Sequence, residues 1–433
     1  MAEPTLPTRQ SQPRLLRPLF DFLRAESAGG YVLVAVTALT LVWANSSWRA
    51  GYAALWSTVV ALRVGGHALV FDARGWVNDG LMTFFFLVVG LEIKRELVDG
   101  ELRGRARAAL PMVSALGGMV VPAAIFLVFN VGGRGGHGWG VPMATDIAMA
   151  VGVLGLAGAA RHRALAVYLL ALAIVDDIGA IVVIAVFYSS GVGFVWLAIG
   201  VVLVGAIVAA QRLGWSSLLV YAPLGAGLWF ALHEAHVHPT LAGVACGLLA
   251  PTQPLLRHDL VDADELAEGL LDVSTVEAAR ETVQLARQSV SVVEWLEHLL
   301  HPWVTFVVVP VFALANAGVV VSSASVRDAA SSSVTLGVVL GLVVGKPLGI
   351  VTFAWLAVRL GVARLPDGVR WPQVVAIGAV AGVGFTVALF VTELAFDDAG
   401  LMAEAKLGIL LASVISAVVG LVALRVTRRA DRI

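Results

Sequence analysis

The chain has 433 residues, of which 59% are hydrophobic and only 14% carry a charge. Soluble domains average about 25% charged residues, so this composition excludes a set of soluble domains and indicates a multi-pass membrane protein. The net charge of −1 gives no support for a nucleic-acid partner, and the single cysteine, Cys246, excludes an internal disulfide framework and a thiolate metal cluster.

The N-terminal part of the chain changes from polar to apolar near residue 29. Residues 1–28 lack the apolar core and cleavage site of a signal peptide, and we interpret them as a cytoplasmic tail. The first span is expected at about 30–44. Residues 59–72 then contain two strand-like stretches on either side of Gly65-Gly66, which predicts a β-hairpin. A plain extracellular loop is the alternative interpretation.

Eleven further apolar segments follow, which predicts about twelve transmembrane helices in an all-α membrane protein. Their expected bounds are 76–98, 108–130, 140–160, 164–188, 192–210, 217–232, 237–249, 303–320, 336–358, 374–394 and 406–425. Residues 253–290, largely acidic and poor in aromatic residues, are interpreted as a cytoplasmic loop insertion. The chain is thus expected to form one integral membrane domain over 29–428, with a C-terminal tail at 429–433.

Positive charges are distributed unevenly over this predicted topology. With the N-terminus inside, 22 of the 29 lysines and arginines lie on cytoplasmic segments and five lie on outside segments. Cytoplasmic loops of membrane proteins are enriched in these two residues. The asymmetry therefore favours twelve spans with both termini in the cytoplasm.

Four charged residues lie deep inside predicted spans, where an ionised group costs about 2.5–3.5 kcal/mol. They are Asp146 in the fourth span, Asp176 and Asp177 in the fifth, and Lys346 in the tenth. Adjacent residues on a helix point about 100° apart. We therefore expect Lys346 to neutralise one of the adjacent aspartates, while the other faces water and binds a cation or a proton. A purely structural ion pair would need only one aspartate.

The fourth and eleventh spans contain helix-breaking or small residues at membrane depth, in 138–148 and 378–386. Broken helices expose end carbonyls and amides that can serve an ion. The fourth span belongs to spans 3–5 and the eleventh to spans 10–12, which have the opposite orientation, so the pattern predicts an inverted repeat. For the eleventh span alone, small-residue helix packing explains the sequence equally well.

Titratable residues gather at the predicted cytoplasmic edge of the membrane. Glu92 and Arg95 close the second span, and Glu297, His298 and His301 precede the ninth. Histidines and carboxylates in one cluster respond to pH. Ordinary anchoring at the membrane edge and i,i+4 pairing account for the same residues equally well.

Several motifs, taken together and in order over about 79–425, resemble the NhaA family of bacterial sodium/proton antiporters. The motifs are 78–82 (NDGLM), 90–97 (GLEIKREL), 142–148 (PMATDIA), 171–181 (ALAIVDDIGAI), 296–303 (LEHLLHPW), 345–350 (GKPLGI) and 382–386 (GVGFT). The chain departs from the family in its long segment 257–287 and its long N-terminal tail, and neither change touches these motifs.

The resemblance implies a secondary active transporter, with no cofactor and no enzyme activity, in the bacterial inner membrane. It would export Na⁺, and also Li⁺, in electrogenic exchange for a larger number of external H⁺, with roles in sodium and pH homeostasis. The resemblance also implies that Asp177, with Asp176 beside it, binds the transported Na⁺ and H⁺. Asp176 would pair with Lys346, and Asp146 and Thr145 would lie at the crossing of the two broken spans.

The resemblance also implies a pH response and a dimer. The pH-response residues would be Glu92, Arg95, Glu297, His298 and His301, with His238 as a further pH-linked histidine. From its position alone, at the outer start of the eighth span, His238 is interpreted as a membrane-interface residue. The family is a homodimer joined through the hairpin, here 59–72, and is surrounded by membrane lipid.

Competition at a carboxylate is sufficient for such an exchange. Na⁺ is a hard cation that takes oxygen ligands, and a carboxylate that holds a proton coordinates Na⁺ poorly. A site that opens to one side at a time then couples inward H⁺ to outward Na⁺. The alternatives are a cation channel, against which a fixed Lys346 argues, and a cation-coupled symporter, for which no solute pocket is evident. An intramembrane aspartyl protease is more remote, because it leaves the adjacent aspartates unexplained.

Overall fold

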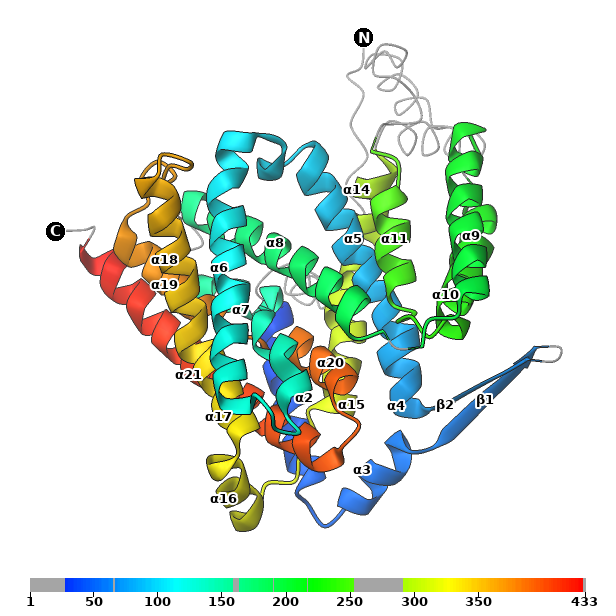
Figure 1. Cartoon of the computed structure of the whole chain (residues 1–433), viewed down its shortest axis with the longest axis horizontal. Helices are drawn as coiled ribbons and strands as arrows, with labels where there is room; N and C mark the ends of the chain where they lie inside the picture. The colour runs from blue at the N-terminus through cyan, green and yellow to red at the C-terminus, as the bar shows by residue number, and fades with distance from the viewer. Residues whose placement is uncertain are drawn as a thin grey trace, which may run out of the picture.

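The protein is described by a computed structural model over residues 28–64, 67–158, 163–189, 191–215, 217–252 and 291–430 (Figure 1). Four expectations fall wholly or largely outside these residues: the N-terminal tail, the Gly65-Gly66 turn, the loop insertion at 253–290 and the C-terminal tail. The described residues form a helical bundle with one small antiparallel sheet.

The first half of the bundle ends with the long helix that carries the adjacent aspartates. Its elements are α2 (Ala28–Ala44), α3 (Arg49–Trp56), β1 (Val59–Val64), β2 (His67–Asp72), α4 (Ala73–Gly75), η1 (Trp76–Leu81), α5 (Met82–Val98), η2 (Glu101–Arg103), α6 (Arg105–Asn130), η3 (Gly136–Met143), α7 (Ile147–Leu156) and α8 (Arg163–Phe187).

The second half begins with a helix pair that lies beside the bundle in Figure 1. Its elements are α9 (Phe194–Arg212), α10 (Leu218–Glu234), α11 (Leu241–Leu249), α14 (Val292–Trp303), η6 (Val304–Val308), α15 (Val309–Asn316), α16 (Ser323–Ser331), α17 (Ser333–Leu340), η7 (Gly341–Gly345), α18 (Lys346–Arg359), α19 (Trp371–Ala381), α20 (Phe385–Ala395) and α21 (Ala399–Ala430).

Six of the described helical segments are long and apolar enough to cross a membrane. The number rises to nine if each of three bent helix pairs counts as one span. Two of these pairs are η3 with α7, bent by 41°, and α19 with α20, bent by 46°. A membrane-spanning helical protein is thus confirmed, while the count of twelve spans and the inverted repeat stay predictions.

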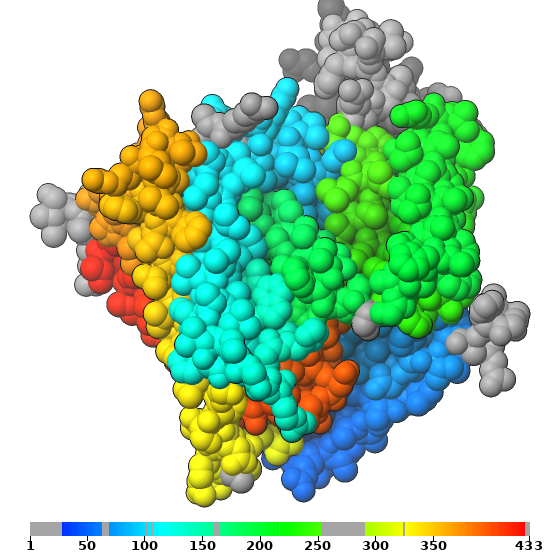
Figure 2. Space-filling model, viewed as in Figure 1, coloured from blue at the N-terminus to red at the C-terminus, as the bar shows by residue number. Residues whose placement is uncertain are grey.

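The predicted β-hairpin is confirmed. β1 and β2 pair in the register Val59↔Asp72 to Val64↔His67. The hairpin extends from the bundle beneath α9 and α10 (Figures 1 and 2). Its base is fixed to α10 by the Phe71 ring, whose centroid lies 6.3 Å from that of Trp229 and 5.0 Å from that of His233. We call the end of the bundle that carries the hairpin the hairpin end.

The expected start of the ninth span is wrong. The helix begins at Val292, where the Ser291 hydroxyl accepts from the Glu294 N–H, and it continues through Pro302 into α15. Proline removes one helical hydrogen bond, and the wider π-type turn η6 directly follows it. Glu297, His298 and His301 therefore lie on the spanning helix, and not on a segment that precedes it.

The last helix also begins earlier than expected, at Ala399. The Asp398 carboxylate accepts hydrogen bonds from the Gly400 and Leu401 N–H groups, at 2.8 and 3.1 Å, and so caps this end of α21. The same two N–H groups hold the pKa of the Asp398 carboxyl below its usual range. A capping aspartate outside the apolar run therefore adds two turns to the helix.

A glycine contact between α6 and α18 sets the position of Lys346. A Cβ on Gly349 would lie 2.1 Å from the Gly117 carbonyl oxygen, so only glycine permits this approach of the two backbones. The π-type segment η7 directly precedes Lys346, and segments of this kind recur at functional sites because they redirect the next turn. Lys346 is 0% exposed.

Candidate ion-binding site

The adjacent aspartates lie near the middle of α8, which runs through the centre of the bundle (Figure 1). Asp176 is 1% exposed and Asp177 is 5% exposed. An ionised group at such a position needs a partner or access to water. The two carboxylates meet this need differently.

Asp176 is neutralised by Lys346 and receives a further hydrogen bond. The Lys346 ammonium forms an ion pair with Asp176 Oδ2 and also donates to Thr145 Oγ1 at 3.0 Å. Thr145 Oγ1 lies 2.7 Å from Asp176 Oδ2 and 2.9 Å from the Ala381 carbonyl oxygen, and its single hydroxyl hydrogen is shared between these two acceptors. The cluster thereby connects four parts of the bundle: α8, α18, the break between η3 and α7, and the end of α19.

Asp177 has no hydrogen bond or ion pair with the residues that the structure describes. Its Oδ1 atom is buried and unpartnered. The Asp176 carboxylate and, more weakly, the Glu92 carboxylate of α5 repel its negative charge, while the Lys346 ammonium attracts it without bonding to it. Asp177 is therefore a buried carboxylate with negative neighbours and no bonded counter-ion, which is the arrangement that favours uptake of a proton or a cation.

Asp146 lies where the two broken helices cross. Its Oδ1 accepts from the Met149 N–H at 2.9 Å and caps α7, while its Oδ2 accepts from the Thr386 N–H at 3.0 Å and Oγ1 at 2.6 Å at the start of α20. The Asp146 N–H donates to the Val383 carbonyl at 2.7 Å. A carboxylate between two helix N-termini is stabilised by both dipoles. Asp146 is therefore saturated with partners, unlike Asp177.

We expect Thr386→Val to loosen this crossing. The change removes the hydroxyl that donates to buried Asp146, at a cost of about 1–3 kcal/mol in the free energy of unfolding. Thermal unfolding in detergent measures the effect. The matched control is Thr392→Val, because the Thr392 hydroxyl donates to Ala388 within α20 and does not touch the crossing. Equal losses in the two variants would contradict the cross-link.

A second cluster joins α5 to α14. Arg95 forms an ion pair with Glu297, and the Glu92 carboxylate interacts electrostatically with both. His298 also interacts with Glu297. Because Glu92 interacts with Asp177 as well, this cluster is electrostatically connected to the aspartates.

Two of the predicted histidines have described contacts of their own. His301 is one helical turn further along α14, with its Nδ1 3.5 Å from Thr305 Oγ1. His238 lies in the turn before α11, and its Nε2 is 2.8 Å from the Tyr188 carbonyl oxygen at the end of α8. A carbonyl accepts only, so Nε2 carries the hydrogen.

Two features of the site region were missed by the sequence interpretation. Thr386 was part of a quoted motif but was assigned no role. It is the second residue of α20, after Phe385, and no local spacing pointed to its contact with Asp146. A second buried ion pair, between Lys406 of α21 and Glu393 of α20, lies at 7% and 10% exposure. The charge of Lys406 within a span was visible in the sequence, but no spacing pointed to its partner.

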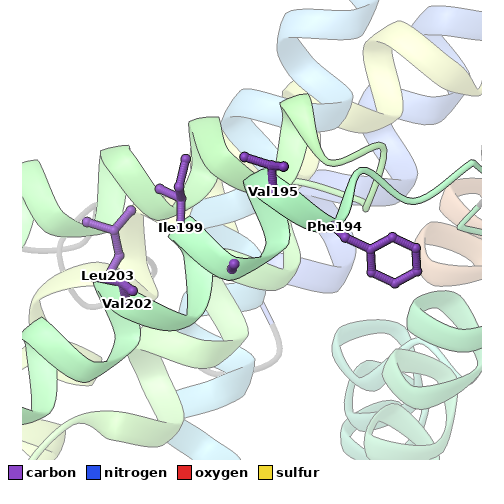
Figure 3. A pocket seen from close by; sticks show the side chains of 6 residues that line it. Phe194, Val195, Ile199, Val202 and Leu203 are labelled. Carbon is purple, nitrogen blue, oxygen red and sulfur yellow. The ribbon is translucent and has the colours of Figure 1, made fainter.

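An apolar groove of about 580 Å³ lies on α9 (Figure 3), whereas the aspartates belong to α8. Its lining residues are Phe194, Val195, Ala198, Ile199, Val202 and Leu203. None of these side chains offers an oxygen ligand, which Na⁺ requires. The groove is therefore unsuited to an ion.

Known proteins match this chain over nearly its whole length. A family described as "Na+/H+ antiporter 1" matches residues 20–424. The Na(+)/H(+) antiporter NhaA 2 of Sorangium cellulosum is 47% identical over 98% of this chain and 93% of its own length. The NhaA antiporters of Rhodopirellula baltica and of a Janthinobacterium species are 46% and 45% identical, over 94% and 96% of this chain and 93% and 95% of their own lengths.

Proposed function

Because the chain belongs to the Na+/H+ antiporter 1 family, we propose that it exchanges Na⁺ for H⁺ as a secondary active transporter, at the buried carboxylates of α8. Sodium/proton antiport is the activity for which its relatives are named. Na⁺ and H⁺ are the transported ions, and Li⁺ is a further substrate because it is a hard monovalent cation that is smaller than Na⁺, whereas K⁺ is larger. No cofactor takes part.

The observation that carries this proposal is the difference between the two adjacent aspartates. Lys346 neutralises Asp176, while Asp177 has no bonded partner in the described part of the chain. One uncompensated carboxylate in a buried site holds either a proton or a metal cation, and holding both is unfavourable. Asp177 is thus the exchange residue, and Asp176, Thr145 and Lys346 shape its surroundings.

Asp146 gives the two broken helices a common anchor at the site. Half-helix ends at membrane depth turn carbonyls and N–H groups towards an ion pathway. Movement of η3 with α7 against α19 with α20 would open the aspartates to one side at a time. Na⁺ released outside is replaced by a proton on Asp177. More protons than Na⁺ ions are carried per cycle because a second group, Lys346, also releases a proton when Na⁺ binds and regains it when Na⁺ leaves. The proton gradient then drives export.

The direct experiment is sodium-induced collapse of a proton gradient in everted membrane vesicles that contain the full chain. We expect Na⁺ and Li⁺ to dissipate the gradient, and K⁺ to have no such effect. Export that continues against an opposing Na⁺ gradient excludes a cation channel. Dependence on an added solute would indicate a symporter, and absence of a Na⁺ response from acid to alkaline pH would contradict antiport.

We also propose a pH response in the cluster of Glu92, Arg95, Glu297 and His298, with His301 and His238 as further titrating residues. The contact between α5 and α14 supports it, because protonation of a carboxylate removes the attraction to Arg95. The net charge of this contact would therefore change with cytoplasmic pH.

Arg95→Gln is expected to move the pH profile of antiport to more alkaline values, by about 0.5–1 pH unit. Without the guanidinium, the ionised form of Glu297 is less favourable and a higher pH is needed to reach it. The measurement is initial antiport rate against pH at saturating Na⁺. Lys94→Gln, which removes a neighbouring charge without a described ion pair, is the control. A profile that stays in place, or moves to acid pH, would contradict the role of Arg95.

The topology proposed for the chain is twelve spans with both termini cytoplasmic, in the bacterial inner membrane. The six to nine candidate spans support a multi-pass protein, and the bends in η3–α7 and α19–α20 support the inverted repeat of spans 3–5 and 10–12. Residues 29–428 form the single membrane domain, with 253–290 as a cytoplasmic insertion. In this orientation the hairpin end faces outwards.

We further propose a homodimer within the lipid bilayer that is joined through residues 59–72. The exposed side chains of Val60, Leu62 and Val70 on the hairpin support it, because an extended two-stranded sheet leaves apolar surface and sheet edges uncovered. Replacement of residues 61–70 by a short turn is expected to give a monomer of unchanged fold. Size-exclusion chromatography with light scattering measures this, and a dimer that persists would contradict the hairpin contact.

A further inference from the structure

Tyr188, at the end of α8, attaches η3 to α8, the helix that carries Asp176 and Asp177. η3 is the half of the broken pair η3–α7 that lies towards the hairpin end. Tyr188 directly follows α8 and is 8% exposed. Its hydroxyl accepts from the Gly140 N–H at 3.1 Å and donates to the His137 carbonyl at 2.9 Å. Both partners belong to η3, the segment that leads into Thr145 and Asp146. The Tyr188 hydroxyl therefore satisfies two backbone groups of η3.

The Tyr188 ring also packs against side chains of η3. The ring lies edge-on to His137, with centroids 5.4 Å apart, and 6.4 Å from the ring of Trp139 in a stacked arrangement. A Cβ on Gly140 would lie 2.7 Å from the Tyr188 hydroxyl oxygen. Glycine at this position is thus required for the hydroxyl to reach the η3 backbone.

The Tyr188 backbone is held in turn by His238, whose Nε2–H donates to the Tyr188 carbonyl at 2.8 Å. Tyr188 therefore cannot shift along η3 without breaking contacts to η3 and to the turn before α11. It lies twelve residues beyond Asp176, which corresponds to about 18 Å along the helix. η3 is consequently fixed to α8 at two distant points: Tyr188 near one end, and the Thr145–Asp176 hydrogen bond just beyond the other.

We propose that Tyr188 is a positioning residue for ion exchange, which fixes η3 against α8 so that Thr145 stays on Asp176. This proposal rests on the exchange at the α8 carboxylates proposed above. Tyr188 does not touch the ion; it sets the position of a hydroxyl that donates to the neighbour of Asp177. Loss of the tyrosine hydroxyl loosens η3, and the aspartates lose a fixed donor.

The test is Tyr188→Phe in the full chain, reconstituted in proteoliposomes with an imposed pH gradient. The phenyl ring keeps the packing and removes both η3 hydrogen bonds. We expect the apparent KM for Na⁺ to rise about 3- to 10-fold, while the maximal rate per folded transporter stays within about twofold. A variant that is merely less stable would lower the maximal rate per total protein and leave KM unchanged.

Tyr168→Phe is the matched control, since Tyr168 also lies on α8 and is 2% exposed. Its hydroxyl donates to Ser114 of α6 at 2.9 Å and does not touch η3. KM should therefore not change in Tyr168→Phe. In a Thr145→Val background, Tyr188→Phe should raise KM no further, because the two residues act in series. Additive effects, or equal effects of the two tyrosine changes, would overturn the positioning role.

Hydrogen–deuterium exchange gives a readout that does not depend on transport. Amides in residues 136–146 should exchange faster in Tyr188→Phe than in wild type or Tyr168→Phe. Unchanged amide exchange in these residues would overturn the positioning role of Tyr188. This readout does not depend on transport. Absence of Na⁺-driven proton release from the wild type is a separate outcome, which would contradict the proposed Na⁺/H⁺ exchange. If Tyr188→Phe does not fold, Gly140→Ala opposes the same contact, and it should raise KM in the same direction.

Discussion

Asp177→Asn is expected to reduce sodium-induced proton release to the level of vesicles without the protein. The amide is nearly the same size as the carboxylate but does not take up a proton and carries no charge for Na⁺. Asp177 has no bonded partner among the described residues, so the substitution breaks no ion pair and the fold should persist. The measurement is the initial rate of gradient collapse at equal amounts of folded protein.

A binding measurement separates loss of the site from loss of motion. Na⁺ at about 100 times its Kd stabilises the protein that binds it by about 2.7 kcal/mol. This stabilisation should be present in the wild type and in Asp328→Asn, where an exposed carboxylate on α16 is removed, and absent in Asp177→Asn. Retention of the Na⁺ effect in Asp177→Asn would show that the cation binds elsewhere.

The sequence predicted the boundaries of elements where the signal is local. The hairpin strands agree with 59–64 and 67–72 because two stretches of strand-forming residues flank Gly65-Gly66 in the sequence, a pattern that predicts a hairpin. The interruptions around Thr145 and Val383 lie where glycine or proline ends a helical turn. The start of α14 was missed because Pro302 resembles a helix start, although Ser291 followed three residues later by Glu294 is itself a local signal of a capped helix N-terminus.

In the candidate site too, the residues could be predicted from local sequence, but their pairing could not. Buried charges are conspicuous in an apolar span because they are costly, so Asp146, Asp176, Asp177 and Lys346 could be identified from the sequence. From the residues alone, the pairing of Lys346 with Asp176 and not with Asp177 could not be predicted. It depends on the rotation of α8 and on the Gly117–Gly349 approach of two other helices. Tertiary contacts of this kind leave no trace in local spacing.

Lys346→Met and Asp176→Asn should each destabilise the protein, and the double variant should be more stable than either. Each single change leaves the other group of a fully buried pair without its partner, which costs about 3–5 kcal/mol in the free energy of unfolding. The double variant contains two neutral side chains of similar size, and the Thr145 hydroxyl still has an acceptor in the amide oxygen. Thermal or denaturant unfolding of the four proteins gives the coupling energy.

The second buried ion pair distinguishes a general effect of buried charge from a role in exchange. Lys406→Met with Glu393→Gln removes a pair of the same chemistry on α20 and α21, and should show the same non-additive stability. Only the Lys346–Asp176 double variant should then have weakened antiport, because Asp177 has lost the ammonium beside its neighbour. Equal antiport rates in the two double variants would mean that Lys346 contributes only to stability. Asp177 would then exchange Na⁺ and H⁺ without help from the Lys346 ammonium.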